Sequence, residues 1–316
     1  MSIIRETDDR QMAKTLDRFD LMRLYVRIAE TGSLSAAGRS LGLSQPSASR
    51  QLRELETALG AQLIMRTTHE LSFTEAGQEF LGQARQLLGD WEAVVEGHRL
   101  RKDDVRGRLR IAVPNGLGQT ILADIAGSFV DRFPSISIEW LLEDEPRDLI
   151  GQGIDIWIRV GQIGDESLIV RGLWEIERAI IGAAHWPFSP DHPRDLTELP
   201  AVILSPYVDR EMALTGPDGI VATIAPRPSI STDNLYAAER LTLAGRGYGI
   251  LPLWLMQPAI EAGRARYLCP GWRPPPLTLS LAYPQTRYRP VRHGLFIDHV
   301  KRELRATGAG ITPLDR

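Results

Sequence analysis

Hydrogen-bonding side chains concentrate between positions 44 and 53 of this 316-residue chain. On a helix that turns by about 100° per residue, Pro46, Arg50 and Arg53 share one side. Gln45 lies at the tip of that side. An arginine placed there presents two N–H arms that match the O6 and N7 acceptors of guanine, whereas glutamine and serine side chains reach base edges or phosphates. The segment predicts a helix that lies in the major groove of DNA, although an ordinary amphipathic surface helix would show the same periodicity.

A short helix and a tight turn precede this segment. Ala37 and Leu41 lie one helical turn apart, and Gly42 tolerates the positive φ with which short helices often end. Ser44 is a good N-cap, and Pro46 lies in the next first turn, where a missing N–H costs little. Two helices joined by such a turn favour a helix-turn-helix over an isolated surface helix.

A small hairpin is expected after the second helix. Short extended runs precede and follow the polar tip 67–70, which predicts a β-hairpin wing able to contact the DNA backbone or the minor groove. The side chains predicted to face DNA come from the two helices, their turn and the wing: Ser33, Ser35, Ser44, Gln45, Pro46, Ser47, Ser49, Arg50, Arg53, Arg66, Thr67 and Thr68.

A long helix is predicted from the Thr74 cap to about His98, because its apolar residues recur at intervals of three and four. A helix of this length does not keep such a stripe exposed, so it needs a partner, and a second copy is the simplest one. Packing on its own DNA-binding module is the alternative. The expected dimer seam, anchored by Leu87 and Trp91, consists of Phe80, Ala84, Leu87, Leu88, Trp91 and Val95.

Strands and helices alternate in the second half of the chain. Runs at 109–114, 136–140 and 154–161 predict strands separated by helices, the pattern of a parallel α/β sheet. Further strands are expected near 168–170, 179–182, 201–204, 228–231 and 248–251. The Pro-rich segment 272–276 then leads to a strand over 277–283 and a helix over 296–304.

The first third of the chain closely resembles the LysR-type transcriptional regulators. Two mild departures, Gly38 for alanine and Ile64 for phenylalanine, remove no DNA-facing group. The segments 155–161 and 247–252 resemble the effector domain of the same family. The signature positions that agree in register are Gly32, Ser33, Leu34, Ala37, Leu41, Ser44, Gln45, Pro46, Ser49, Leu52, Leu55, Glu56, Leu59, Gly60, Leu63, Arg66, Phe73, Thr74, Ala76 and Gly77.

This resemblance implies an α+β multidomain protein. Its parts would be a winged helix-turn-helix at 17–73, a linker and dimerisation helix at 74–99, a hinge at 100–108 and an effector-binding domain at 109–304. That last domain would have the two-lobed α/β fold of periplasmic binding proteins, with lobe I at about 109–164 and 277–304 and lobe II at about 165–276.

The implied function is a sequence-specific DNA-binding regulator whose activity responds to a small molecule held between the lobes. A homodimer or homotetramer is implied too, in which closure of the lobes changes the spacing of the DNA-reading pairs. RNA polymerase is a further expected partner if the protein is an activator.

Polar loops follow the predicted strands, and ligands of two-lobed α/β domains bind at such carboxyl ends. The loop after Val113 is expected to open a helix with Gln119 and Thr120 in its first turn, where free N–H groups favour a carboxylate. Thr120 and Asn234 would equally serve as plain helix caps. The expected pocket, suited to a small organic acid or related metabolite, is formed by Pro114, Asn115, Gly116, Gln119, Thr120, Gln162, Ser205, Tyr207, Thr232, Asp233 and Asn234.

Charge and composition agree with this organisation. The whole chain carries a formal charge of −3, yet residues 18–66 contain seven arginines and four acidic residues, so the basic excess lies in the DNA-binding module. The single cysteine, Cys269, excludes an internal disulfide and is interpreted as a packing residue rather than a redox site. No metal-ligand spacing, cofactor motif, secretory signal or long apolar run is found, so we expect a cytoplasmic protein without cofactor or metal.

Two other functions compete with this interpretation. An enzyme is disfavoured because the glycine-rich run 245–249 follows a helix and precedes a strand, the reverse of a dinucleotide loop, and because no catalytic constellation is found. A constitutive DNA-binding protein would leave about two hundred residues of α/β domain without a role. A ligand-responsive regulator accounts for both halves of the chain.

Overall fold

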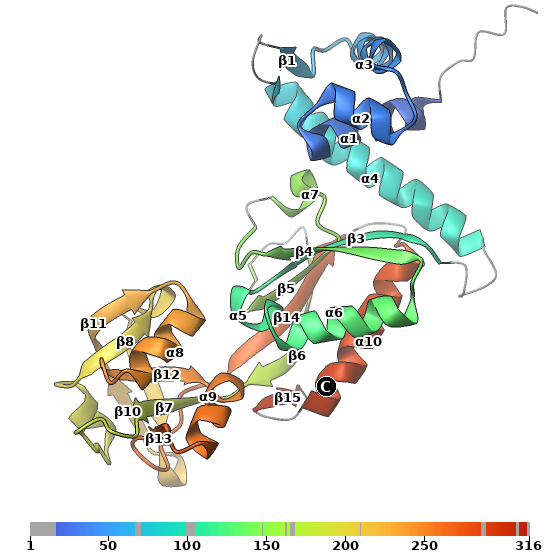
Figure 1. The fold of residues 1–316 in the computed structure, drawn as a ribbon. Coiled ribbons are helices and arrows are strands. Elements are labelled where there is room, and N and C mark those ends of the chain that lie inside the picture. Colours follow the sequence, from blue (N-terminus) through green and yellow to red (C-terminus); the bar gives the residue numbers. More distant parts are fainter. Residues whose placement is uncertain are drawn as a thin grey trace, which may run out of the picture. The chain divides into compact units, whose positions relative to one another are not determined.

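The computed structural model describes residues 17–66, 71–98, 105–146, 148–161, 163–164, 168–208, 210–285, 289–307 and 310–314. The chain forms two compact units, which are described separately below (Figure 1). Of the described residues, the first unit contains 17–66, 71–98, 148–153 and 289–290, and the second contains the others.

The N-terminal unit is a winged helix-turn-helix followed by a long helix. Its core is formed by one face of each helix, including Leu24, Ile28, Ala48 and Leu52, and all four side chains are buried. The two wing strands pair antiparallel, with Ile64 opposite Phe73. The elements are α1 (Arg18–Thr31), α2 (Leu34–Ser40), α3 (Gln45–Leu59), β1 (Ile64–Arg66), β2 (Leu71–Phe73) and α4 (Glu75–His98).

Caps set the boundaries of these helices, and the predicted N-cap Ser44 is confirmed. The side chain of Ser33 accepts a hydrogen bond from the N–H of Ala36, and that of Ser44 accepts one from the N–H of Ser47. Gly32 and Gly60 end α1 and α3 in the left-handed region, at φ 62° and 66°. The recognition helix therefore begins and ends where local chemistry dictates.

The long helix approaches the wing so closely at Gly77 that no side chain fits there. A Cβ at this position would lie 2.1 Å from the carbonyl oxygen of Leu63. The buried hydroxyl of Tyr25 donates a hydrogen bond of 2.9 Å to the Gly77 carbonyl oxygen. Helix α1, strand β1 and helix α4 are thus held together at one point.

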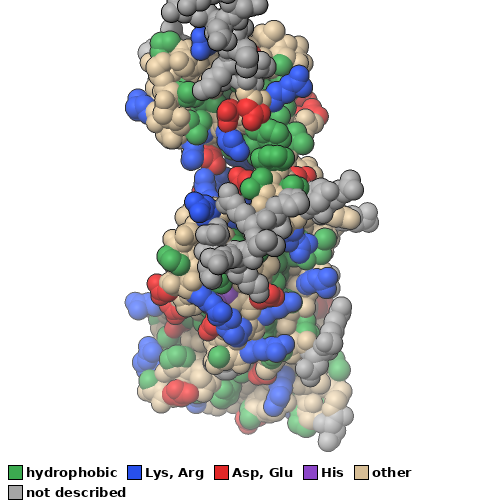
Figure 2. Space-filling model, turned by 90° about the vertical axis from the view of Figure 1, so that its right-hand side faces the viewer, with side chains coloured by type: hydrophobic (Ala, Val, Ile, Leu, Met, Phe, Trp, Pro, Cys, Tyr) green, Lys and Arg blue, Asp and Glu red, His purple; other side chains and the backbone are tan. Residues whose placement is uncertain are grey.

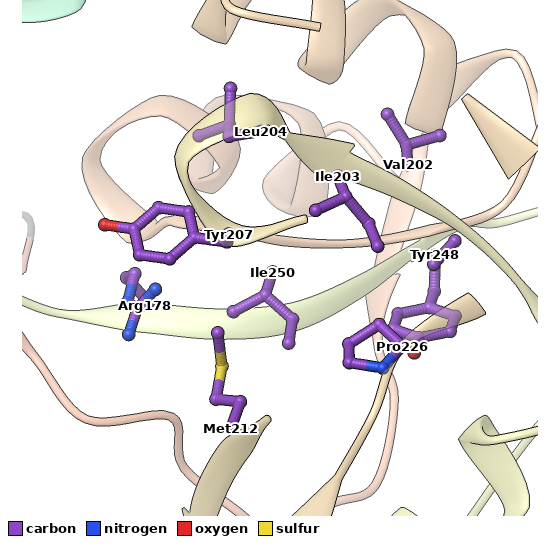
Figure 3. A pocket seen from close by; sticks show the side chains of 10 residues that line it. Arg178, Val202, Ile203, Leu204, Tyr207, Met212, Pro226, Tyr248 and Ile250 are labelled. Carbon is purple, nitrogen blue, oxygen red and sulfur yellow. The ribbon is translucent and has the colours of Figure 1, made fainter. Parts of the chain in front are cut away.

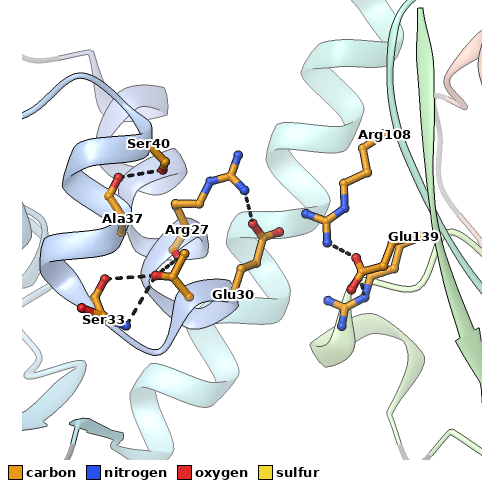
Figure 4. Close-up of polar contacts among 9 residues, drawn as sticks. Arg27, Glu30, Ser33, Ala37, Ser40, Arg108 and Glu139 are labelled. Carbon is orange, nitrogen blue, oxygen red and sulfur yellow. Dashed lines mark hydrogen bonds and ion pairs between the residues drawn. The ribbon is translucent and has the colours of Figure 1, made fainter. Parts of the chain in front are cut away.

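Lobe I of the C-terminal unit contains a six-stranded mixed sheet in the order β15-β6-β14-β5-β3-β4. Helices α6 and α10 pack together, with the rings of Phe129 and Phe296 5.1 Å apart. Arg108 and Glu139 form an ion pair across neighbouring strands β3 and β4 (Figure 4). The elements are β3 (Gly107–Val113), α5 (Asn115–Gly118), α6 (Ile121–Arg132), β4 (Ile136–Leu142), β5 (Ile156–Val160), β6 (Leu168–Ile176), β14 (Leu277–Pro284), α10 (Val291–Thr307) and β15 (Ile311–Pro313). Helix α7 (Leu149–Gln152) lies between β4 and β5 in the chain but belongs to the first unit.

Lobe II contains a five-stranded sheet in the order β11-β8-β12-β7-β13. Helices α8 and α9 cover one face, and the antiparallel pair β9–β10 lies over the other (Figure 1). The elements are β7 (Arg178–Ala183), β8 (Pro200–Leu204), β9 (Met212–Thr215), β10 (Val221–Ile224), β11 (Arg227–Thr232), α8 (Leu235–Leu243), β12 (Tyr248–Pro252), α9 (Leu253–Glu261) and β13 (Ala265–Tyr267), with the short 3₁₀ helices η2 (Pro193–Leu196), η3 (Ser205–Tyr207) and η4 (Pro217–Gly219) in the loops.

The structure corrects one expectation about this unit and extends two others. Strand β6 belongs to lobe I rather than to the predicted lobe II at 165–276, because it pairs antiparallel with β14 along its whole length. The three strands predicted to form a parallel sheet, β3, β4 and β5, do run parallel, and β14, β6 and β15 extend them into a mixed sheet. The C-terminal helix, expected over 296–304, is longer in the structure, and β15 follows it and pairs with β6 at the edge of the sheet.

Substituting Gly77 tests how much the close approach of α4 contributes to stability. Gly77→Ala is expected to lower the free energy of unfolding by about 1–3 kcal/mol, because the added methyl group must displace the Leu63 carbonyl. In the same helix, a Cβ at Gly89 would meet nothing within 4 Å, so Gly89→Ala is expected to stabilise by about 0.5–1 kcal/mol. Urea titration followed by circular dichroism measures the free energy of unfolding of each variant. Equal stabilities of the two variants would contradict the close contact between Gly77 and the Leu63 carbonyl.

Candidate DNA interface and effector site

The recognition helix α3 presents the predicted faces. Gln45, Pro46, Arg50 and Arg53 are exposed, and Ser47 and Ser49 are half-buried at the flanks. The opposite stripe of Ala48, Leu52 and Leu55 is buried in the core. Gln51 is also buried, which the periodicity did not lead us to expect. Packing thus leaves the predicted polar face available to a partner.

Positive charge without an acidic partner gathers on α2 and α3. On α1, Arg23 pairs with Asp20 at 2.9 Å. Arg27 pairs with Glu30 at the same distance (Figure 4). In the described part of the chain, Arg39, Arg50 and Arg53 form no ion pair. Over the face shown in Figure 2, basic and acidic side chains are interspersed on both units. The unpaired arginines, not the net charge of −3, therefore mark the surface suited to phosphates and base edges.

Arg50 and Arg53 differ in how they are held. The Nε of Arg53 donates to the Ser49 carbonyl oxygen at 3.3 Å, so its side chain lies along its own helix. Arg50 makes no such contact with the residues that the structure describes, and its guanidinium keeps all its donors for a ligand. Arg50 is the better placed of the two to reach a base.

The wing is anchored by residues that the sequence did not single out. The Glu56 carboxylate accepts hydrogen bonds from the N–H groups of Leu63 and Ile64, at 2.9 and 3.3 Å. Thr74 donates to the Gln62 carbonyl oxygen at 2.7 Å. The sequence singled out Glu56 only as a position of the family signature. Its place near the end of α3, just before the wing, was the one sign in the sequence that it contacts the wing.

Some of the residues predicted to face DNA form hydrogen bonds within the protein, and others lie outside the described residues. Ser33 and Ser44 cap their helices, and Ser35 is half-buried in the first turn of α2. Arg66 occupies its predicted strand, but its side chain, together with Thr67 and Thr68, lies outside what the structure describes.

The predicted dimer seam on α4 divides into two groups. Phe80, Ala84 and Leu88 are buried, and the first two lie in the core of their own DNA-binding module. Leu87 and Trp91 are exposed by 49% and 45%. The Trp91 ring also stacks on Phe19, with centroids 5.3 Å apart. The alternative of packing within one chain thus accounts for the first group, and Val95 is half-buried.

Strand ends of the two lobes meet where the sequence predicts an effector pocket. The hydroxyl of Tyr236 on α8 donates to the Gly116 carbonyl oxygen on α5 at 3.0 Å. A Cβ at Gly116 would lie 2.7 Å from Leu235. The N-terminal ends of α5 and α8 are therefore in contact. Pro114 and Gly116 are buried there, while Gln119, Ser205 and Asp233 are exposed.

The expected anion site at the start of α5 is corrected. The Asp144 carboxylate accepts hydrogen bonds from the backbone N–H of Asn115 at 3.3 Å and from its side-chain amide at 2.7 Å. A protein carboxylate already occupies the positive end of this four-residue helix, so a second anion is disfavoured there. Gln119 and Thr120 lie between α5 and α6, not in the first turn of a single helix.

The capping alternatives are resolved differently for Thr120 and Asn234. Asn234 caps α8, because its side chain accepts from the N–H of Ala237 at 3.0 Å, and its own N–H donates to Thr232 at 3.1 Å. Thr120 makes no side-chain capping bond. Gln162 lies outside the described residues.

Sequence reasoning missed Arg178, which lies at the same edge as the predicted loops. Strand β7 runs antiparallel to β12, with Arg178 opposite Pro252, so its first residue lies beside the carboxyl ends of β8 and β12. Only residues that follow parallel strands entered the predicted set. Arg178 is 93% buried, since its relative exposure is 7%. Its cation lies 5.4 Å from the centre of the Tyr207 ring, a residue of the predicted pocket.

The described residues give little support for a metal site or a redox-active thiol. No group of three histidine, cysteine or acidic side chains gathers there as metal ligands would. Burial raises the pKa of the Cys269 thiol to about 12, which keeps it protonated and favours the packing interpretation. None of the helices in the described part of the chain has the length and apolar character of a membrane span.

Family models and relatives agree with both units. The LysR substrate binding domain matches residues 102–305, and the bacterial regulatory helix-turn-helix of the lysR family matches residues 19–78. The HTH-type transcriptional regulator PtxR of Pseudomonas aeruginosa is 31% identical over 311 residues, which cover 93% of this chain and 96% of the relative. The HTH-type transcriptional activator AaeR of Escherichia coli is 27% identical over 280 residues, 88% of this chain and 91% of the relative.

Solved structures share the fold. A full-length OxyR variant from Pseudomonas aeruginosa aligns with a TM-score of 0.69 at 17% identity, over 94% of this chain and 98% of that one. The Vibrio cholerae virulence activator AphB aligns with a TM-score of 0.57 at 23% identity, over 89% and 97%. With its helix-turn-helix, its two-lobed regulatory domain and these relatives, the chain belongs to the LysR family: it is a LysR-type transcriptional regulator with an effector-binding domain.

Proposed function

We propose that α3 reads the base edges of an operator and that a small molecule, bound where the strand ends of the two lobes meet, controls this reading. The observation that carries the first part is the exposed, unpaired Arg50 on a capped helix. The contact of α5 with α8 supports the second part. The protein would act by binding rather than by catalysis, on DNA in the cytoplasm, with RNA polymerase as a further partner if it activates transcription.

Arg50 and Arg23 provide a matched test of DNA reading. Arg50→Ala is expected to cost on the order of 1–3 kcal/mol of discrimination at one operator position, because a forked donor to guanine is lost. Arg23→Ala, which removes an arginine paired with Asp20 on α1, is expected to leave that discrimination unchanged. Gel-shift titrations with operator and random DNA measure both. If Arg50→Ala binds both DNAs as the unchanged protein does, the assigned face is wrong.

We further propose that two chains associate through the exposed part of α4, around Leu87 and Trp91. Both side chains are about half exposed although they are large and apolar. Two DNA-binding modules would then read a partly palindromic site. The second module would compensate for the small excess of basic over acidic residues in each one. Association of dimers into tetramers would involve the effector domains.

Charged substitutions test this seam. The double variant Leu87→Asp and Trp91→Asp is expected to give a smaller species and weaker operator binding, because two carboxylates cannot be desolvated in an apolar interface. Leu59→Asp on α3, where the side chain is 43% exposed, is the control and should leave the mass unchanged. Light scattering after gel filtration gives the masses, and an unaltered mass of the double variant would overturn the seam.

For the effector, we propose a small organic acid or related metabolite that contacts Asn115, Thr120 and Ser205 together with Tyr207. The carboxylate of Asp144 disfavours an acidic group of this ligand at the start of α5. Because Thr120 makes no side-chain capping bond, Thr120→Val removes its hydroxyl without uncapping a helix.

A thermal-shift screen of organic acids, amino acids and sugars on the full chain would supply the ligand for calorimetry. Binding at a hundredfold excess over Kd raises the stability by about 2.7 kcal/mol, which such a screen detects. Thr120→Val, Asn115→Ala and Tyr207→Phe are each expected to bind it about tenfold more weakly, as when one hydrogen bond is lost. If all three bind it as the unchanged protein does, the effector lies elsewhere.

A further inference from the structure

Lobe II contains a pocket of its own, on the sheet face that lies under the β9–β10 pair (Figure 3). The space around its lining is about 360 Å³ when the open solvent at its mouth is counted, and the enclosed part is far smaller. Arg178 and Tyr207 lie at one end and Tyr248 at the other, beside Pro226. Ile250 and Met212 lie between these ends, so an apolar middle separates two polar groups.

The Arg178 end is a buried cation without an acidic partner. Arg178 is 7% exposed, and its Nε and Nη2 donate to one oxygen, the Pro275 carbonyl, at 3.0 and 2.7 Å. Among the described residues no carboxylate pairs with it. Burial lowers the pKa of its guanidinium, opposed by the nearby Tyr207, yet arginine stays charged at neutral pH. A buried charge held by one neutral carbonyl favours an anionic ligand.

The opposite end presents a hydrogen-bond donor. Tyr248 is 1% exposed, and its hydroxyl has no hydrogen-bond partner among the residues that the structure describes. Burial raises the pKa of this phenol, so the hydroxyl remains neutral and keeps its proton. Buried donors are nearly always satisfied in folded proteins, and a ligand oxygen at this end would accept the bond.

We propose that this pocket binds a small monocarboxylate with a compact apolar body, its carboxylate on Arg178 and its body against Ile203, Ile250 and Met212. A second oxygen at the far end of the ligand would accept a hydrogen bond from Tyr248. All the lining residues belong to lobe II, and only Tyr207 is shared with the inter-lobe set. The site therefore stands whether or not the inter-lobe proposal holds.

Calorimetry with the full-length protein and three probes tests the chemistry of the pocket. Phenylacetate should bind saturably at millimolar concentrations or below, and its neutral amide should bind at least tenfold more weakly. 4-Hydroxyphenylacetate should bind more tightly than phenylacetate, and Tyr248→Phe should abolish that difference while phenylacetate binding persists. Equal binding of acid and amide, or no saturable binding of either acid, would overturn the proposal.

Substitutions locate the site. Arg178→Met should weaken phenylacetate binding by about 10- to 100-fold, as expected for loss of a charge-assisted bond. Arg227→Met makes the same change at an exposed position of lobe II and should have no effect. Because Arg178 also bonds to Pro275, its loss could unfold the lobe, so circular dichroism accompanies each variant. Met212→Trp then fills the middle of the pocket with Arg178 in place, and it too should abolish binding.

Two outcomes separate this site from the one between the lobes. If Asn115→Ala abolishes phenylacetate binding while Arg178→Met and Met212→Trp retain it, the acid binds between the lobes and the pocket proposal is wrong. If the pocket variants alone lose it, the pocket is confirmed, and the inter-lobe effector is still tested by its own screen.

Discussion

The two lobes of the regulatory domain are joined by two chain crossings, and one buried guanidinium ties these crossings together. The first crossing ends at Arg178, directly after β6, and the second passes through Pro275, just before β14. Arg178 donates two hydrogen bonds to the Pro275 carbonyl oxygen. A buried cation costs a great deal unless its donors are used, so any rotation of one lobe against the other must preserve or replace these bonds.

A comparable constraint organises the DNA-binding module. Gly77 allows α4 to touch the Leu63 carbonyl, and Tyr25 closes the same contact from α1. Glu56 then holds the start of the wing against the end of α3. The recognition helix, the wing and the long helix therefore behave as one body, and the exposed side of α3 has a defined direction relative to the start of α4. Such rigidity is what base reading requires, since contacts to base edges depend on the orientation of one helix.

Charged side chains are distributed unevenly along the chain, and the total charge of −3 does not show this. On α1, Arg23 and Arg27 pair with acidic residues one turn away, whereas Arg50 pairs with none among the described residues. At the strand ends of lobe I the reverse holds, because Asp144 already satisfies the positive start of α5. In lobe II, by contrast, the buried Arg178 donates to a neutral carbonyl oxygen and pairs with no carboxylate among the described residues.

Local chemistry in the sequence was sufficient to predict the start and the apolar face of the recognition helix. Ser44 and Pro46 mark the start of α3, and Gly60 marks its end. The spacing of Ala48, Leu52 and Leu55 defines the buried face of this helix, because caps and helical periodicity act over a few residues. Tertiary structure decided what depends on distant partners. The chain alone could not show that β6 pairs with β14, that Phe80 and Ala84 serve their own module, or that Asp144 reaches Asn115 across 29 residues. Arg178 was not predicted for the same reason. Because β7 runs antiparallel to β12, the first residue of β7 lies at the edge of the sheet where β12 ends.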